Sequence, residues 1–93
     1  MKALVYSVSR YDFEADGKSL RGTKVGVLEK TEDDNNRLGY LSMVLQSNDY
    51  ELYDLFFQVP GIYDIEVKML PGAKGIPRLV PVDAKLIREV TIQ

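Results

Sequence analysis

Turn signals divide this chain into short segments that are rich in β-forming residues. Asp16-Gly17 is a dipeptide typical of two-residue hairpin turns, and Pro60-Gly61 and residues 71–75 also favour turns. The segments between these signals carry Val, Ile, Leu and Tyr, which favour strands. A chain of 93 residues has room for one modest core. We therefore expect a single, mainly all-β domain that spans residues 1–93.

Five or six short strands are predicted. Their ranges are 2–8 (continuing less regularly to 13), 19–30, 38–46, 62–70 and 76–92, the last as one strand or as two, 76–82 and 84–92. Gly22 and Gly26 predict a bulge or a bend in the second strand. Pro77 and Pro81 favour an edge position for the first part of the last region. Residues 31–36 form a polar loop.

The hydrophobic period changes over residues 48–58. Leu52, Leu55 and Phe56 are spaced as on one face of a helix, and Asn48 is a suitable N-cap. Three strands, a short helix and two further strands describe a small five-stranded oligonucleotide-binding (OB)-like Greek-key barrel. An open β-meander fits the same strands, but the bent second strand and the position of the helix between strands 3 and 4 favour the barrel.

The chain contains no His and no Cys, which excludes whole classes of chemistry. Catalytic triads, thiol nucleophiles, disulfides and imidazole or thiolate metal sites all need these residues. The carboxylate pairs Asp33-Asp34 and Asp49 with Glu51 lack the spacing of a calcium loop. We therefore expect no enzyme, no catalytic residue, no cofactor, no metal site and no small-molecule substrate.

The apolar stretches also bear on location. None reaches the roughly 18–20 residues of a membrane span, and the stretch after Lys2 is too short for a secretory signal peptide. We expect a cytoplasmic protein that does not bind membranes.

Charge is unevenly distributed around a formal net charge of −2. Residues 17–30 carry four cations and one carboxylate, whereas residues 31–66 carry one cation and eight carboxylates. Residues 67–93 are basic again. Two basic segments can converge on one face, and such a face attracts a polyanion because binding depends on local potential. Scattered solvated charges are the alternative interpretation.

The basic hairpin segment is the first candidate site. Lys18, Arg21 and Lys24 lie among three glycines, without the order of a phosphate-binding P-loop. On a regular strand Lys18 and Lys24 share one face and Arg21 takes the other. These residues either contact phosphates or line a solvent-facing hairpin.

Aromatic residues and the C-terminal cations complete the candidate set. Single-strand binding needs aromatic rings beside a cationic groove, and Tyr11, Phe13 and Tyr40 lie near the basic segment. Tyr6, Phe56, Phe57 and Tyr63 have apolar neighbours at core spacing and are expected inside. In the strand over residues 62–70, the alternation also predicts that Tyr63, Ile65, Val67 and Met69 face inward. Arg78 and Lys85 either touch phosphate or protect an edge strand.

Two stretches resemble the filamentous-phage helix-destabilising proteins, the small gene V type single-stranded-DNA-binding family. Gly17-Lys18-Ser19-Leu20-Arg21-Gly22-Thr23-Lys24 is similar to the family's basic DNA-binding wing. Pro60-Gly61-Ile62-Tyr63-Asp64-Ile65 is similar to its Pro-Gly-aliphatic-Tyr strand. The chain departs from the family in its acidic total charge, in the residue 48–57 helix and in the wing aromatic, where Val25-Gly26-Val27 stands instead.

The resemblance implies a two-fold dimer that coats single strands of DNA, or of RNA, in the bacterial host of a phage or another mobile element. By position, Arg21 and Lys24 match the wing cations, Tyr40 a base-stacking aromatic, and Lys85 or Arg78 the cations of the final strand. The alternative is a protein-interaction module without nucleic-acid binding, which uses the acidic helix face of Asp49, Glu51 and Asp54.

Overall fold

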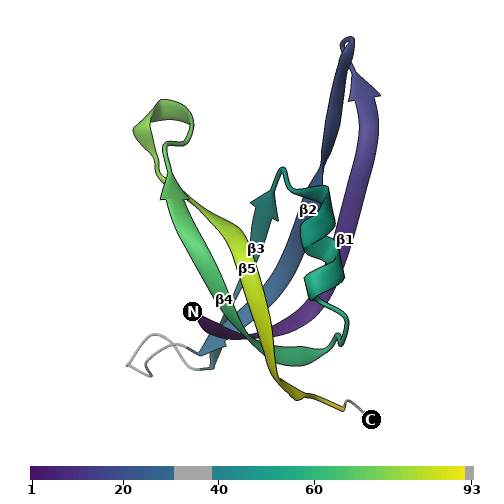
Figure 1. Ribbon diagram of the computed structural model, residues 1–93. Coiled ribbons are helices and arrows are strands. Elements are labelled where there is room, and N and C mark those ends of the chain that lie inside the picture. Colours follow the sequence, from purple (N-terminus) through teal and green to yellow (C-terminus); the bar gives the residue numbers. More distant parts are fainter. Residues whose placement is uncertain (31–38, 92–93) are drawn as a thin grey trace.

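The computed structural model describes residues 1–30 and 39–91. They form five strands and two short 3-10 helices (Figure 1). In chain order these are β1 (Lys2–Ala15), β2 (Lys18–Lys30), β3 (Tyr40–Ser47), η1 (Tyr50–Leu55), β4 (Gly61–Leu70), η2 (Ala73–Gly75) and β5 (Arg78–Glu89). The polar loop expected at residues 31–36 lies outside the described residues.

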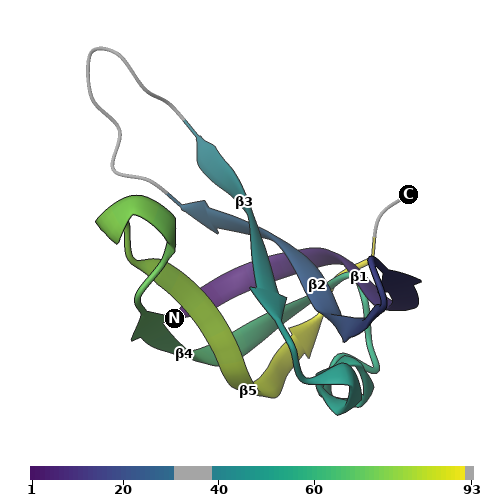
Figure 2. The same cartoon turned by 90° about the horizontal axis from the view of Figure 1, so that it is seen from above.

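All five strands belong to one antiparallel sheet with the order β3-β2-β1-β4-β5. The sheet curls so that its two edge strands, β3 and β5, come into contact (Figure 2). With β1 between β2 and β4 and η1 between β3 and β4, the predicted OB-like Greek-key barrel is confirmed in a partly open form. The last region is a single edge strand, β5, which continues through Pro81.

The β1–β2 hairpin projects beyond the barrel as a two-stranded arm (Figure 1). β4 pairs with β1 only over Lys2–Val5, and β3 pairs with β2 only from Thr23 onward. Residues 11–22 therefore pair only with each other. The turn at Asp16-Gly17 has positive φ at both residues, 53° and 74°, which is the geometry of the type I′ turn that this dipeptide favours.

The core lies between the inner faces of β1, β2, β3 and β4. It is built from aliphatic side chains and Tyr63, and η1 adds Leu52 and closes one side with the Phe56 ring that follows it. Phe56 packs on Tyr63 at 5.1 Å between ring centroids. The expected core positions of Phe56 and Tyr63 are confirmed.

The helix over residues 48–58 is shorter than predicted and of the tighter 3-10 type. It spans six residues, and Asp49, not Asn48, is its N-cap, because the Asp49 carboxylate accepts from the Glu51 N–H at 3.0 Å. Only Leu52 of its six residues is buried, and Leu55 is exposed. The helix ends at Phe56, because this C-cap residue leaves helical geometry with φ −99° and ψ 60°.

Three aromatic or apolar residues expected inside lie at the surface. Tyr6 and Phe57 are 41% and 75% exposed, and Met69 of the inward-facing set of β4 is 67% exposed. Met69 lies near the end of β4, beyond a register shift between Glu66 and Val67, where no core remains to cover it. Phe57 follows Phe56, whose ring is buried in the core, and points to the surface instead.

No helix in the described ranges is long and apolar enough to cross a membrane.

The Tyr63 hydroxyl offers a test of the core. It accepts from the Gln58 N–H at 2.9 Å and donates to the Gln58 carbonyl at 2.8 Å. Tyr63→Phe removes this hydroxyl and leaves the part-buried Gln58 N–H and carbonyl without it as a partner. The free energy of unfolding, measured by urea denaturation, should therefore fall by about 1–3 kcal/mol. Tyr40→Phe, at an exposed ring, is the control and should change it by less than about 0.5 kcal/mol. Equal stability of the two variants would contradict the buried network.

Candidate nucleic-acid interface

The alternation of side chains along β2 decides which candidate residues meet. β2 pairs with β1 and β3 without a break in its own register, so successive side chains point to opposite faces. Thr23, Val25 and Val27 are fully buried on the inner face. Lys18 and Lys24 therefore share the outer face and Arg21 lies on the inner one, as the spacing predicted.

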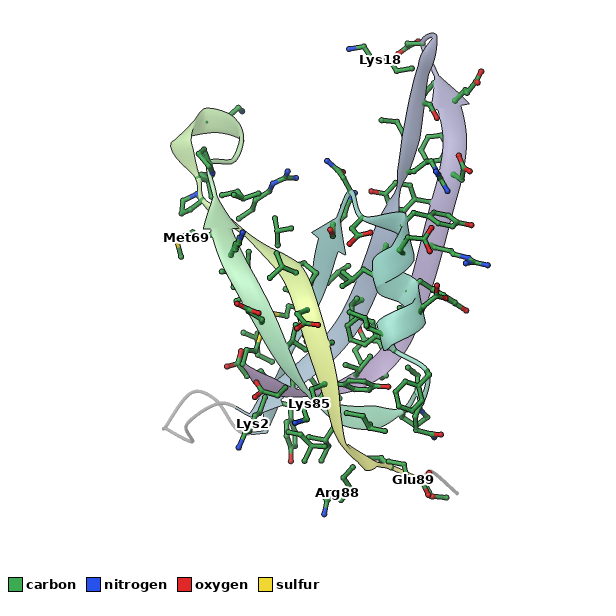
Figure 3. All side chains as sticks on the ribbon, in the orientation of Figure 1. Lys2, Lys18, Met69, Lys85, Arg88 and Glu89 are labelled. Carbon is green, nitrogen blue, oxygen red and sulfur yellow. The ribbon has the colours of Figure 1, made fainter. Side chains whose placement is uncertain are left out.

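The outer face of β1, β2 and β3 gathers aromatic and basic side chains. We call this row the aromatic stripe. It consists of Tyr6, Tyr11, Phe13, Lys18, Leu20, Lys24, Leu28 and Tyr40, by register and contact. Lys18 marks its outer end at the tip of the arm (Figure 3). Four of the aromatic and basic candidates thus share one face of the sheet with a fifth, Tyr40, which lies toward the end opposite Lys18 and is 63% exposed.

Tyr6 owes its place in the stripe to a bulge and a glycine. The register of β1 shifts between Val5 and Ser7, so that Tyr6 is the extra residue. Its ring lies over Gly26, where an added Cβ would stand 2.7 Å from Tyr6 Cζ. Its hydroxyl reaches across β2 to Ser42 Oγ of β3, 3.2 Å away. A bulge was predicted in the second strand, but the register shift lies in β1. Gly26 instead leaves the space that the Tyr6 ring occupies.

Tyr11 repeats this arrangement over Gly22. A Cβ at Gly22 would stand 2.7 Å from Tyr11 Cζ, and the Tyr11 hydroxyl accepts from Gln46 Nε2 of β3 at 2.8 Å. Lys24 Nζ lies 5.7 Å from the centre of the Tyr11 ring, and the Phe13 ring lies 6.0 Å away. Both tyrosines therefore lie flat, each with one face on the sheet and a fixed hydroxyl.

Charge is sorted between the two faces of the arm. Asp12 pairs with Arg21 and Glu14 with Ser19 in the β1–β2 register, which puts both carboxylates on the inner face. On the outer face, the described residues of β1, β2 and β3 include no carboxylate. Lys18 and Lys24 are therefore cations without a neutralising neighbour on that face, although the whole chain is acidic.

The inner face of the arm is attached to η1 through arginine–tyrosine contacts. The Arg10 guanidinium carbon lies 4.9 Å and 4.6 Å from the ring centres of Tyr50 and Tyr53. Arg21 lies 4.2 Å from the Tyr50 ring, and its Nε is 3.3 Å from Asp12 Oδ2. Thr23, fully buried, donates from Oγ1 to the Asp49 carbonyl at 2.8 Å. These contacts fix the base of the arm, and they engage Arg21 with a carboxylate.

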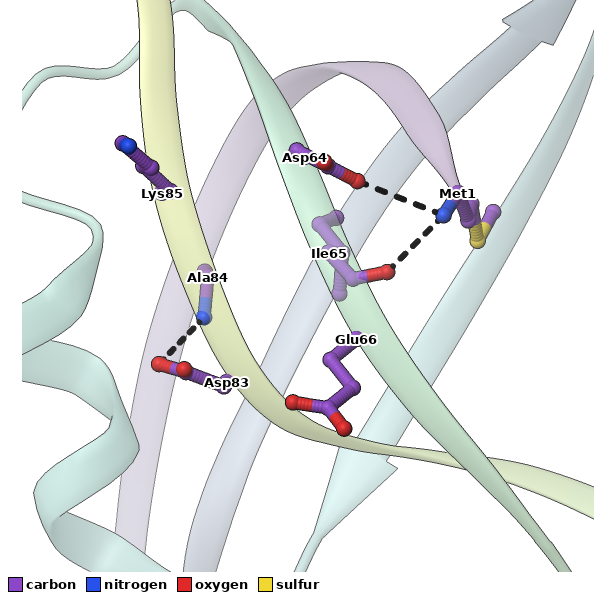
Figure 4. Close-up of a pocket in the computed structure, with 7 residues that line it drawn as sticks. All are labelled: Met1, Asp64, Ile65, Glu66, Asp83, Ala84 and Lys85. Atoms are coloured by element: carbon purple, nitrogen blue, oxygen red, sulfur yellow. Dashed lines mark hydrogen bonds and ion pairs between the residues drawn. The ribbon is translucent and has the colours of Figure 1, made fainter.

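Arg78 and Lys85 lie apart from the stripe. Arg78 begins β5 at the β4–β5 hairpin. Lys85 lines a cavity with three carboxylates, those of Asp64, Glu66 and Asp83 (Figure 4). The Met1 amino group lies 3.5 Å from Asp64 Oδ1 and donates to the Ile65 carbonyl at 3.1 Å in the same cavity. The local potential at Lys85 is therefore less favourable to a polyanion than at Lys18 or Lys24.

Sequence reasoning missed Tyr6, Leu28, Arg10, Tyr50 and Tyr53. The signal for Tyr6 was available, because a glycine inside a strand also marks the close approach of another group, and aromatic rings commonly cover such glycines. No comparable signal links Arg10 to η1. In the described part of the chain, no group of acidic residues is arranged to hold a metal ion.

Comparison of the chain with models of known protein families, with curated proteins and with solved structures finds no match.

A double-mutant cycle tests the contact between Tyr6 and Gly26. Gly26→Ala displaces the Tyr6 ring from its position over Gly26, so we expect a loss of about 1–3 kcal/mol in unfolding free energy. In a Tyr6→Ser background the added methyl still meets Ser7 Oγ, 2.6 Å away, but it meets no ring, so the same substitution should cost less. We expect a coupling of about 0.5–3 kcal/mol from urea denaturation of the four proteins. Additive effects would contradict the packing of the ring on Gly26.

Proposed function

We propose that this protein is a non-enzymatic single-stranded nucleic-acid-binding protein that coats strands of DNA along the aromatic stripe. The observation that carries the proposal is the combination, on one face, of the exposed Tyr6 ring and the half-buried Tyr11 ring, both packed flat on the sheet, with Lys18 and Lys24 and without carboxylates. Rings beside cations are what sequence-tolerant binding of single strands requires.

The energetics of the stripe favour a single strand over a duplex. A base stacked on an aromatic ring contributes about 1–3 kcal/mol, and the lysines add the release of counterions from the phosphates. Because Tyr6 and Tyr11 each have one ring face on the sheet, only the opposite face can receive a base, and at Tyr11 the Lys24 ammonium group already lies 5.7 Å from the ring centre. Bases inside a duplex have both faces covered by their neighbours, so a duplex offers the stripe only its phosphates.

The length of the stripe suits several nucleotides. From Lys18 to Leu28 it follows ten steps of β2, which at about 3.3 Å per residue is about 33 Å. OB-type domains cover about 4–16 nucleotides. The wing and Pro-Gly-Tyr stretches that resemble the filamentous-phage family add to this proposal and suggest a phage or mobile-element protein that acts in the bacterial cytoplasm.

Charge reversal at Lys18 and Lys24 tests whether the aromatic stripe binds the strand. We expect fluorescence anisotropy of a labelled oligothymidylate to report tight binding at low salt and weak binding at high salt, with little binding of a duplex. The double variant Lys18→Glu with Lys24→Glu should bind at least about tenfold more weakly and lose about 1.4 from the log–log salt slope.

The matched control is Lys68→Glu with Lys74→Glu, which changes net charge equally at exposed positions away from the stripe. Because both lysines lie on the β4–β5 hairpin, binding is compared only after sedimentation velocity shows that this variant keeps the oligomeric state of the natural protein. It should retain most of the affinity. Equal weakening by both double variants would reduce the interaction to net charge and would contradict the stripe.

We further propose that the protein acts as a homodimer through the β4–β5 hairpin. Met69 and Ile76, which are 67% and 68% exposed, lie there with the exposed side chains of Leu70 and Leu79. In Figure 3, Met69 stands near the end of β4, apart from the arm. Met69 and Leu79 are cross-strand partners on one face of the hairpin, whereas Leu70 lies opposite Arg78 on the other face. With Ile76 in the connection between the strands, Met69 and Leu79 are exposed apolar side chains of the kind that a second copy covers.

Sedimentation velocity tests this assembly. The natural protein should sediment as a dimer at micromolar concentration, and Met69→Glu with Ile76→Glu should sediment as a monomer. Circular dichroism should stay unchanged, because both side chains are exposed in the isolated chain. A natural protein that remains monomeric, or a variant that remains dimeric, would contradict the hairpin interface.

A protein-interaction module is the second candidate. Phe57 and Leu55 are exposed beside the acidic residues Glu51 and Asp54, a combination that fits a basic partner segment with an apolar anchor. Absence of oligonucleotide binding at low salt would favour this function, and Asp54→Lys should then abolish partner binding.

A further inference from the structure

An apolar groove continues the outer face of the sheet beyond the aromatic stripe. Leu4, Leu28 and Ile62 form its floor and Tyr40 one wall. Leu4 pairs with Leu28 on one side and with Ile62 on the other, so the three side chains lie next to one another on the same face. The groove thus joins β1, β2, β3 and β4 at the end of the sheet opposite the tip of the arm.

Two cations stand at the groove and no described carboxylate lines it. Lys2 and Arg88 are both lining residues, and both are exposed. Figure 3 shows them at the end of the molecule opposite Lys18. Arg88 pairs with Ile62 across the β4–β5 ladder, so the Arg88 side chain leaves the backbone beside Ile62 of the apolar floor.

We infer that this groove binds one nucleotide of the single strand, with the base on the apolar floor against Tyr40 and the phosphate between Lys2 and Arg88. The inference rests on the proposed function, since the groove shares Tyr40 and Leu28 with the stripe. The groove would give one nucleotide of the nucleic acid a defined site, whereas the aromatic stripe stacks bases without fixing their positions.

The chemistry of the lining selects a nucleotide. A nucleobase is flat and largely apolar on its faces, and it stacks on aromatic rings and on guanidinium planes, both of which the groove supplies. Its phosphate is an anion, which matches the two cations. The carboxylate nearest in register, Asp64 opposite Lys2, is paired with the Met1 amino group and is not part of the groove lining. The groove volume of about 380 Å³ lies near the lower end of the range of small-ligand sites, about 300–1,000 Å³. It therefore suits one nucleotide better than a folded segment of a partner.

Affinity as a function of strand length tests the groove. Oligothymidylates that lengthen by one nucleotide are titrated into the natural protein, into Arg88→Glu and into Lys68→Glu, the last with the same change in net charge at an exposed site away from the groove. We expect the affinity of Arg88→Glu to stop rising about one nucleotide earlier than that of the other two proteins. A chain-terminal abasic nucleotide should produce the same loss in the natural protein.

A second measurement reads the groove directly. In carbon-13 methyl spectra, the longest oligomer should shift the signals of Leu4, Leu28 and Ile62, and an oligomer one nucleotide below the saturating length should leave the Ile62 signal in place. Arg88→Glu should abolish the Ile62 shift.

The outcomes separate the two proposals. If the natural protein binds oligomers and Arg88→Glu reaches saturation at the same length as Lys68→Glu, the groove inference is wrong and the proposed function stands. If Arg88→Glu loses the same affinity for oligomers of every length, Arg88 acts through long-range electrostatics, and the groove inference is again wrong. If the natural protein binds no oligomer at low salt, both proposals fail.

Discussion

The unbroken alternation of β2 is the constraint on which the rest of the structure depends. One set of its side chains, Thr23, Val25 and Val27, is fully buried and holds the barrel together. The other set is committed to the outer surface by the same register. A shift of one residue would exchange the two sets, moving Lys24 into the core and Val25 to the surface, so the core specifies the surface chemistry.

The same alternation explains how an acidic protein acquires a basic face. Asp12 and Glu14 of β1 follow the inner parity of the arm, where Asp12 meets Arg21. The lysines of β2 follow the outer parity. Net charge is a property of the whole chain, whereas an approaching polyanion responds to the potential of the surface it meets. Because the alternation places lysines and carboxylates on opposite faces, the outer face of the arm is basic although the net charge of the whole chain is negative.

Sequence reasoning anticipated the features that depend on local patterns. The Asp16-Gly17 turn, the shared face of Lys18 and Lys24, the burial of Tyr63 and the strand–helix order all follow from periodicity and turn chemistry. It failed where position depends on partners distant in sequence. Tyr6 was expected inside because its neighbours are apolar, but the bulge at that residue and Gly26, twenty residues away, bring its ring to the surface. The end of the apolar core likewise leaves Phe57 and Met69 exposed.

The packing of two tyrosine rings on the glycines of β2 has a mechanical consequence for the edge of the sheet. Tyr6 and Tyr11 cross over β2 at its two glycines and are fixed to Ser42 and Gln46 of β3. The edge strand is thus tied to β1 by side chains as well as to β2 by its backbone ladder. Local opening of β3 would release the Tyr6 and Tyr11 rings together, and the surface would lose the flat rings on which bases stack. The fraying of one edge strand and the loss of the stacking surface are therefore a single event.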